Sequence, residues 1–128
     1  VEPLRAFGRR HAIWGTCAGA IFLSADIHRD QPLLGLMNIT VERNAFGRQV
    51  DSFETDLAVP FTDDPAPYHA VFIRAPLIRE VRPPAEILSA LPDGRVVAAR
   101  QGRLMATSFH PELTGDLRFH RYFLELSK

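Results

Sequence analysis

Residues 12–23 read Ala-Ile-Trp-Gly-Thr-Cys-Ala-Gly-Ala-Ile-Phe-Leu, and this stretch predicts a short strand, a tight turn and a helix. The single cysteine of the chain, Cys17, stands at the turn, with Gly15 and Gly19 two residues away on either side. Small residues suit this place because bulky side chains would clash with the adjoining strand and helix. The dipole and free N–H groups of a helix N-terminus also favour a thiolate. The pattern predicts a nucleophilic Cys17 in an α/β fold, with a small buried cysteine as the alternative.

The composition is that of an ordinary folded domain, and we expect one domain over residues 1–128. The formal net charge is zero and no basic run occurs, which argues against nucleic acid as the main partner. No apolar stretch approaches the roughly 20 residues of a membrane span. One cysteine cannot form an internal disulfide, which favours a reducing cytoplasm. The five histidines show no ligand spacing with Cys17, so neither a metal nor another cofactor is expected.

Hydrophobic periodicity and turn residues predict the other elements. Residues 1–10 have helical spacing, and Gly8 is expected to end that helix. Further helices are expected over residues 18–25 and 117–126, with His120 on the surface of the second. Strands are expected at residues 12–14, 33–41, 50–59, 68–73, 86–91, 96–100 and 104–108. Short turns join the last three strands, which predicts a hairpin series at a sheet edge.

Two arginines are candidate binding residues because of their positions in the sequence. Arg43 lies in the polar segment 42–49 between two predicted strands, and a loop of this length suits ligand binding. A solvated hairpin loop is the alternative for that segment. Arg74 ends the strand 68–73, and Pro76 then prevents further pairing. Such a position aims a cation at a site, or makes a salt bridge at a sheet edge.

The segment His110-Pro111-Glu112 carries the second chemical motif. In an extended backbone residues i and i+2 point the same way, so Glu112 can orient the His110 imidazole. Pro111 ends the preceding strand and places both side chains at its C-terminal edge. Cys17 also follows a strand, and sites form at this edge of an open α/β sheet. Nucleophile, base and orienting carboxylate are therefore expected to converge.

This arrangement predicts acyl transfer through a thioester. Cys17 attacks a carbonyl carbon, His110 takes the thiol proton and returns it to the leaving group, and Glu112 stabilises the imidazolium. Water then hydrolyses the thioester. Each half-reaction passes through an oxyanion, and the backbone N–H of Ala18 is one candidate donor to it.

With these motifs the sequence resembles the class I (triad) glutamine amidotransferases. Three further segments, 41–49, 72–76 and 98–102, make it similar to the family of glutaminase subunits of pyridoxal 5′-phosphate synthase. The resemblance implies a flavodoxin-like α/β fold with a mostly parallel sheet flanked by helices. It extends from Trp14 to the closing helix.

The resemblance also implies a function. Members hydrolyse L-glutamine to glutamate and ammonia and pass the ammonia to a (β/α)₈-barrel synthase subunit, which builds vitamin B6. The positions that match the family's triad are Cys17, His110 and Glu112. The positions that match its glutamine-binding residues are Arg43, Ile73 and Arg74. An arginine also suits the carboxylate of glutamine on physical grounds.

The sequence departs from the family at its N-terminal side. The family begins with a Leu-Gln-Gly-Asp-like motif and has a Pro-Gly-Gly-Glu-Ser loop that supplies the second oxyanion donor, and neither occurs in these residues. The domain is therefore expected to lack roughly its first third. Two other functions remain open: a docking subunit without catalysis, or a thiol-sensing α/β protein. The His-Pro-Glu motif argues against the sensor, which needs no acid–base relay.

Overall fold

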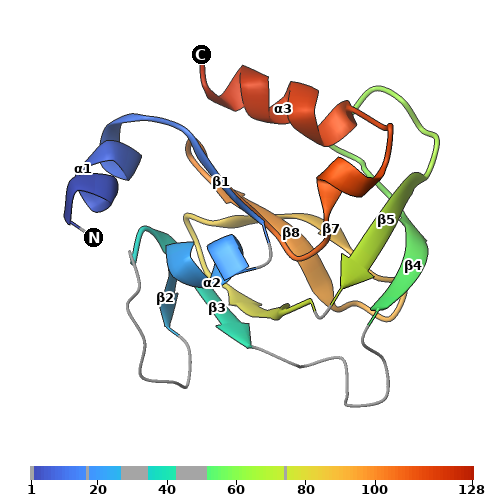
Figure 1. The fold of residues 1–128 in the computed structure, drawn as a ribbon, viewed down its shortest axis with the longest axis horizontal. Coiled ribbons are helices and arrows are strands. Elements are labelled where there is room, and N and C mark those ends of the chain that lie inside the picture. Colours follow the sequence, from blue (N-terminus) through green and yellow to red (C-terminus); the bar gives the residue numbers. More distant parts are fainter. Residues whose placement is uncertain (1, 17, 27–34, 43–51, 74) are drawn as a thin grey trace.

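The computed structural model describes residues 2–16, 18–26, 35–42, 52–73 and 75–128 (Figure 1). The helices are α1 (Glu2–Arg10), α2 (Ala18–Leu23) and α3 (Arg118–Leu126), with the 3₁₀ helix η1 (Pro111–Leu113) before α3. The strands are β1 (Ile13–Thr16), β2 (Ser24–Asp26), β3 (Met37–Glu42), β4 (Ser52–Leu57), β5 (Tyr68–Ile73), β6 (Leu77–Val81), β7 (Glu86–Ala90), β8 (Val96–Gln101) and β9 (Leu104–Thr107).

Seven of these strands form one mixed sheet in the order β1-β9-β8-β6-β3-β2, with β7 paired to β8. The pairs β1–β9 and β2–β3 are parallel, whereas the β3–β6, β6–β8, β7–β8 and β8–β9 pairs are antiparallel. The α/β fold class is confirmed, but a mostly parallel sheet is wrong for the described residues. Short turns join β7 to β8 and β8 to β9, and such turns can join only antiparallel neighbours.

The hairpin series of residues 86–107 is confirmed, and its expected place at a sheet edge holds only for β7, which among the described strands pairs with β8 alone. β9 lies between β1 and β8, and β8 pairs with β9, β6 and β7. Strands in the middle of a sheet are buried on both faces, which explains why all four β9 residues are buried. β8 and β9 therefore lie inside the sheet, and β9 leads to the base motif.

Other boundaries differ because tertiary packing overrides local propensity. The helix expected over 18–25 ends at Leu23, and residues 24–26 pair with β3 instead. The predicted stop at Gly8 is wrong, since α1 continues to Arg10. A Cβ on Gly8 would clash with Leu36 Cδ1. The glycine therefore lets the Leu36 side chain pack closely against α1. Strand β6 was not expected, because Pro76 suggested the end of pairing.

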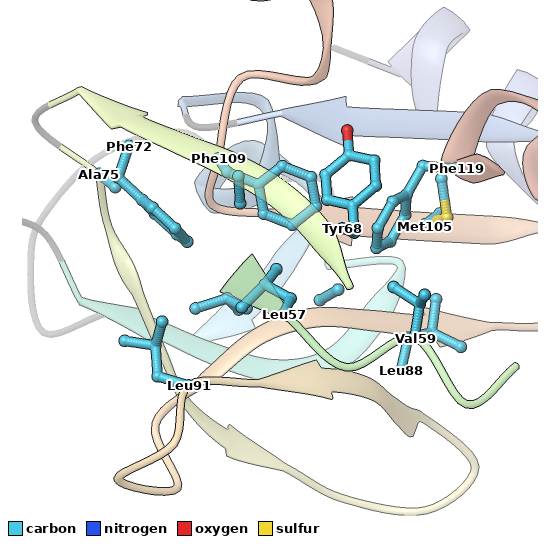
Figure 2. Packing of buried hydrophobic residues seen from close by; sticks show 13 residues of the cluster. Leu57, Val59, Tyr68, Phe72, Ala75, Leu88, Leu91, Met105, Phe109 and Phe119 are labelled. Carbon is cyan, nitrogen blue, oxygen red and sulfur yellow. The ribbon is translucent and has the colours of Figure 1, made fainter. Parts of the chain in front are cut away.

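The two faces of the sheet carry different cores. Alternate residues of β9 divide between them: Leu104 and Ala106 face α2 with Ala20, whereas Met105 faces α3. The second core is rich in aromatic rings, and Figure 2 shows Tyr68, Phe109 and Phe119 side by side, with Met105 next to Phe119. In Figure 1, α3 lies above the sheet on this side and α2 lies among β1, β2 and β3. The members of this aromatic core are Leu57, Val59, Tyr68, Ala70, Phe72, Ala75, Leu88, Leu91, Val97, Ala98, Met105, Phe109 and Phe119.

β4 and β5 pair antiparallel as a two-stranded ribbon, and this β4–β5 ribbon carries an exposed histidine between two carboxylates. His69 Nδ1 lies 2.9 Å from Asp56 Oδ1, and Nε2 lies 2.6 Å from Glu54 Oε1. The hydrogen bond to Glu54, followed by that to Asp56, raises the pKa of His69 above its ordinary value. The raised pKa means that the stabilising contribution is complete below the unfolded pKa of about 6.5 and is lost as pH rises through the folded pKa.

We therefore expect His69→Gln to lower the melting temperature most at about pH 6 and least at about pH 9. The comparison is thermal unfolding of both proteins across this range, at low salt and again at high salt. High salt should shrink the difference because both carboxylates are exposed. A melting-temperature difference that does not change with pH would contradict this interpretation.

Candidate active site

The candidate site begins where β1 and β9 end side by side. The two strands are parallel and pair Ile13 with Leu104 at one end and Thr16 with Thr107 at the other. α2 then begins at Ala18, so the strand before position 17 and the helix after it are confirmed. Cys17 itself lies outside the described residues. The ends of β1 and β9 therefore bring the sequence positions of both motifs to one edge of the sheet.

Gly15 is required by the packing of α2 against β1. A Cβ at Gly15 would lie 2.5 Å from the Gly19 carbonyl oxygen and 2.9 Å from Leu23 Cδ1. The nearer contact is to backbone, which cannot turn aside as a flexible side chain can. No described atom lies within 4 Å of a Cβ built at Gly19. The expected need for small residues on both sides of Cys17 thus holds for Gly15 on the described contacts, but not for Gly19.

We expect Gly15→Ala to destabilise the protein by about 1–3 kcal/mol or more, because α2 must move away from β1. Gly19→Ala is the matched control and should be neutral or slightly stabilising, since alanine favours a helix over glycine by up to about 1 kcal/mol. Thermal and denaturant unfolding of both variants measure the difference. Equal losses of stability in the two variants would contradict the role assigned to Gly15.

His110 is held by its backbone and by its neighbour. The His110 N–H donates to the Val71 carbonyl of β5 at 2.8 Å. Phe109 is fully buried, and its ring centroid lies 4.9 Å from that of Phe119 and 5.8 Å from that of Phe72. Figure 2 shows Phe109 inside the aromatic core. The imidazole therefore projects from a rigid point between β9 and β5.

His110 and Glu112 are in contact, as the sequence predicts. His110 Nδ1 lies 2.8 Å from Glu112 Oε2. The hydrogen bond from His110 is the main reason that the pKa of Glu112 lies below its usual range. An ionised carboxylate can only accept, so the proton is on Nδ1 and the lone pair of a neutral imidazole is on Nε2. This is the tautomer that a general base needs.

The backbone that makes this contact differs from the one expected. His110 is extended, but Pro111 begins a 3₁₀ turn that contains Glu112, so the two residues do not lie in one extended segment. The turn brings the carboxylate back onto the imidazole. The Glu112 side chain is 60% exposed and that of His110 25%, so the dyad lies at the surface, open to a substrate.

The remaining predicted site residues are described only in part. Ala18 is the first residue of α2, where a free backbone N–H is expected. Ile73 ends β5 and is 42% exposed, two residues beyond the Val71 carbonyl that binds His110. Arg43 and Arg74 lie outside the described residues, as does Cys17.

The sequence did not predict a cluster formed by Trp14, Thr107 and His120. Trp14 Nε1 donates to Thr107 Oγ1 at 3.0 Å, and the Trp14 ring meets His120 of α3 edge-on at 5.1 Å. The prediction of a surface His120 is wrong, because Nδ1 is buried, without a hydrogen-bond partner among the described residues. A Trp three residues before the cysteine and a Thr three residues before the histidine were the available signals.

Two features of the described ranges bear on other functions. Within them, no group of three or more His, Cys, Asp or Glu side chains is placed to hold a metal ion. Among the helices described, none has the length and apolar character needed to cross a membrane.

Comparison with known proteins identifies the family of the chain. The model of the SNO glutamine amidotransferase family matches residues 1–128. A relative from Herpetosiphon aurantiacus, named pyridoxal 5′-phosphate synthase subunit PdxT, is 64% identical over 118 residues, which cover 89% of this chain and 62% of the relative. A protein of the same name from Moorella thermoacetica is 60% identical over 128 residues, covering 98% of this chain and 67% of that protein.

A solved structure, a crystal structure of a glutamine amidotransferase, is 48% identical with a TM-score of 0.88. The match covers 98% of this chain and 67% of the solved chain. The chain thus spans about two thirds of the length of these proteins, 62% of one and 67% of the others. On the match over all its residues, the chain belongs to the SNO glutamine amidotransferase family.

Proposed function

We propose that the protein hydrolyses L-glutamine to glutamate and ammonia with a Cys17–His110–Glu112 triad. The observation that carries this proposal is the 2.8 Å contact between His110 Nδ1 and Glu112 Oε2 at the end of β9. A histidine oriented in this way can take a proton from a nucleophile and return it to a leaving group.

The topology supports Cys17 as that nucleophile. Thr16 pairs with Thr107, so the residue after β1 and the segment after β9 start from the same edge of the sheet. α2 begins directly after position 17 at Ala18, and a helix N-terminus favours a thiolate. The reaction then runs through a thioester, with the Ala18 N–H as one donor to the oxyanion.

Glutamine is the proposed substrate because the family is one of glutamine amidotransferases. Arg43 and Arg74 are the proposed partners of its carboxylate, since arginine binds carboxylates through two parallel hydrogen bonds. Ile73 would contribute an apolar contact for the methylene groups. Its exposed side chain and its place beside the Val71–His110 hydrogen bond support that role.

The proposed recipient of the ammonia is a synthase subunit. Relatives at 64% and 60% identity carry the name pyridoxal 5′-phosphate synthase subunit, and the sequence resemblance implies a (β/α)₈ barrel as the partner. Vitamin B6 synthesis is then the pathway, and the single cysteine of these residues suits a cytoplasmic location.

The test is glutamate release from L-glutamine, measured with and without the synthase subunit, for the unchanged protein and for Cys17→Ala. We expect turnover that the partner stimulates and that Cys17→Ala abolishes. A Ser89→Ala variant, which loses a buried hydroxyl on β7, serves as a control that should keep its turnover.

Two results would overturn the proposal. One is turnover that survives in Cys17→Ala. The other is the absence of turnover with the partner present, in a protein extended to the full length of the relatives. Partner binding without turnover in that extended protein would instead establish a docking subunit.

A further inference from the structure

Trp14 and Thr107 form the one side-chain hydrogen bond among those described that links β1 to β9. Trp14 stands three residues before Cys17, and Thr107 stands three residues before His110. The bond therefore joins the strand that leads to the proposed nucleophile to the strand that leads to the proposed base.

The register of the strands explains how the bond forms. Trp14 pairs with Met105, and Thr16 pairs with Thr107. Side chains two residues apart on a strand share a face, so Trp14 and Thr107 point to the same face as diagonal neighbours. The indole N–H therefore reaches Thr107 Oγ1 at 3.0 Å only in this register. A slip by one residue would turn one of the two side chains to the opposite face.

The Thr107 side of the bond is shielded from water, and α3 contacts the indole. Thr107 is fully buried, whereas Trp14 is half-buried. The ring centroid of Trp14 lies 5.1 Å from that of His120 and 5.7 Å from that of Phe123, both on α3. Trp14 thus contacts β9 through its N–H and α3 through its ring. This part-buried hydrogen bond fixes position because breaking it would leave the buried Thr107 hydroxyl without this partner.

The strands themselves are short enough to need such a contact. β1 and β9 are four residues long each, and β1 is at one end of the order of strands described. Within that order β1 pairs only with β9. A four-residue parallel ladder leaves freedom to shear, and reacting groups displaced by about 1 Å can lose about 10²-fold in rate.

We propose that Trp14 and Thr107 are positioning residues, whose hydrogen bond sets the relative placement of Cys17 and His110. This inference rests on the proposed glutaminase function and deepens it. Both residues act through the ends of β1 and β9.

The test uses variants that remove each side of the bond. Thr107→Val deletes the hydroxyl at nearly constant shape, and Trp14→Phe deletes the N–H while keeping an aromatic ring. Thr107→Ser keeps the hydroxyl and should restore function. Ser89→Ala is the matched control, since it removes a buried hydroxyl that donates to the Ala58 carbonyl, away from β1 and β9. The melting temperature of every variant is measured in parallel.

Two readouts separate positioning from a loss of stability. The first is kcat and KM for glutamine hydrolysis with the synthase subunit. We expect Thr107→Val and Trp14→Phe each to lower kcat about 10- to 100-fold with KM within about twofold. The double variant should be no worse than the poorer single one, because both changes remove the same interaction.

The second readout is the pH dependence of alkylation by iodoacetamide, for which Cys17 is the single site. In the unchanged protein we expect the midpoint below the ordinary thiol value of about 8.5, and in both single variants a shift towards that value. Thr107→Ser and Ser89→Ala should keep the midpoint of the unchanged protein.

Each outcome supports or overturns the inference. Variants that keep kcat and the alkylation midpoint while only their melting temperature falls would show that the bond is structural. An ordinary midpoint in the unchanged protein would also overturn it. A lowered midpoint that shifts in the variants, in a protein that hydrolyses no glutamine, would support the positioning and refute the proposed glutaminase function.

Discussion

His110→Asn is expected to lower kcat for glutamine hydrolysis by about 10³-fold or more, because the proton of the nucleophile then has no acceptor. The fold should survive. Phe109 supplies the buried anchor of this segment, and the His110 N–H bond to the Val71 carbonyl is made by backbone. The measurement is glutamate release with the synthase subunit present, alongside thermal unfolding. The variant should melt within a few degrees of the unchanged protein.

Glu112→Gln separates orientation from proton transfer. An amide cannot stabilise an imidazolium as a carboxylate does, so we expect a loss in kcat of about 10²- to 10⁴-fold, less than or equal to that of His110→Asn. His69→Asn, at an exposed histidine of the β4–β5 ribbon, is the control and should keep full activity. A His110→Asn protein with normal turnover would show that this dyad is not the base of the reaction.

Arg118→Met is expected to destabilise the protein by about 3–5 kcal/mol, the largest effect on folding that we predict. The Arg118 side chain is 9% exposed and lies against Asp116, with Nη2 2.6 Å from Oδ2. Its guanidinium also donates to the carbonyls of Ala66 and Pro67, which fixes the end of the loop before β5. Methionine would leave these carbonyls without the guanidinium donor, and the Asp116 carboxylate would keep the backbone N–H of residue 118 but lose the charged partner.

Two further variants test the reason for that loss. Arg118→Lys keeps the charge but not the planar set of donors, so it should recover only part of the stability. Arg121→Met removes an exposed arginine three residues further along α3. This change should alter the free energy of unfolding by about 0.5 kcal/mol or less. Denaturant unfolding measures all three. Similar losses for Arg118→Met and Arg121→Met would show that the buried network around Asp116 contributes little.

The sequence predicted those elements whose signals are local. Strand 68–73 has the bounds that alternation and the following proline indicate, and the strand before position 17 and the helix after it follow from a short apolar run and glycines. The motif His110-Pro111-Glu112 predicted the contact between its outer residues, although a 3₁₀ turn makes it. Side-chain reach over two residues tolerates several backbone conformations, so the contact was easier to predict than the backbone.

The features that the sequence did not predict depend on residues that are far away in the sequence. Residues 24–26 join a sheet because β3 offers an edge there, which no property of that helical stretch reveals. His120 is half-buried because Trp14 lies against it, and the Trp14–Thr107 bond joins residues 93 positions apart. Pairs so far apart in the sequence cannot be predicted until the order of the strands is known.

The most direct test of the proposed triad is covalent labelling by a diazoketone analogue of L-glutamine, with the synthase subunit present and the intact mass as readout. If Cys17 is the nucleophile of a glutamine site, one adduct forms on Cys17, excess L-glutamine prevents it, and Cys17→Ala and His110→Asn reduce or abolish it. A protein that hydrolyses glutamine yet gains no adduct on Cys17, or gains one that glutamine does not prevent, would contradict the triad.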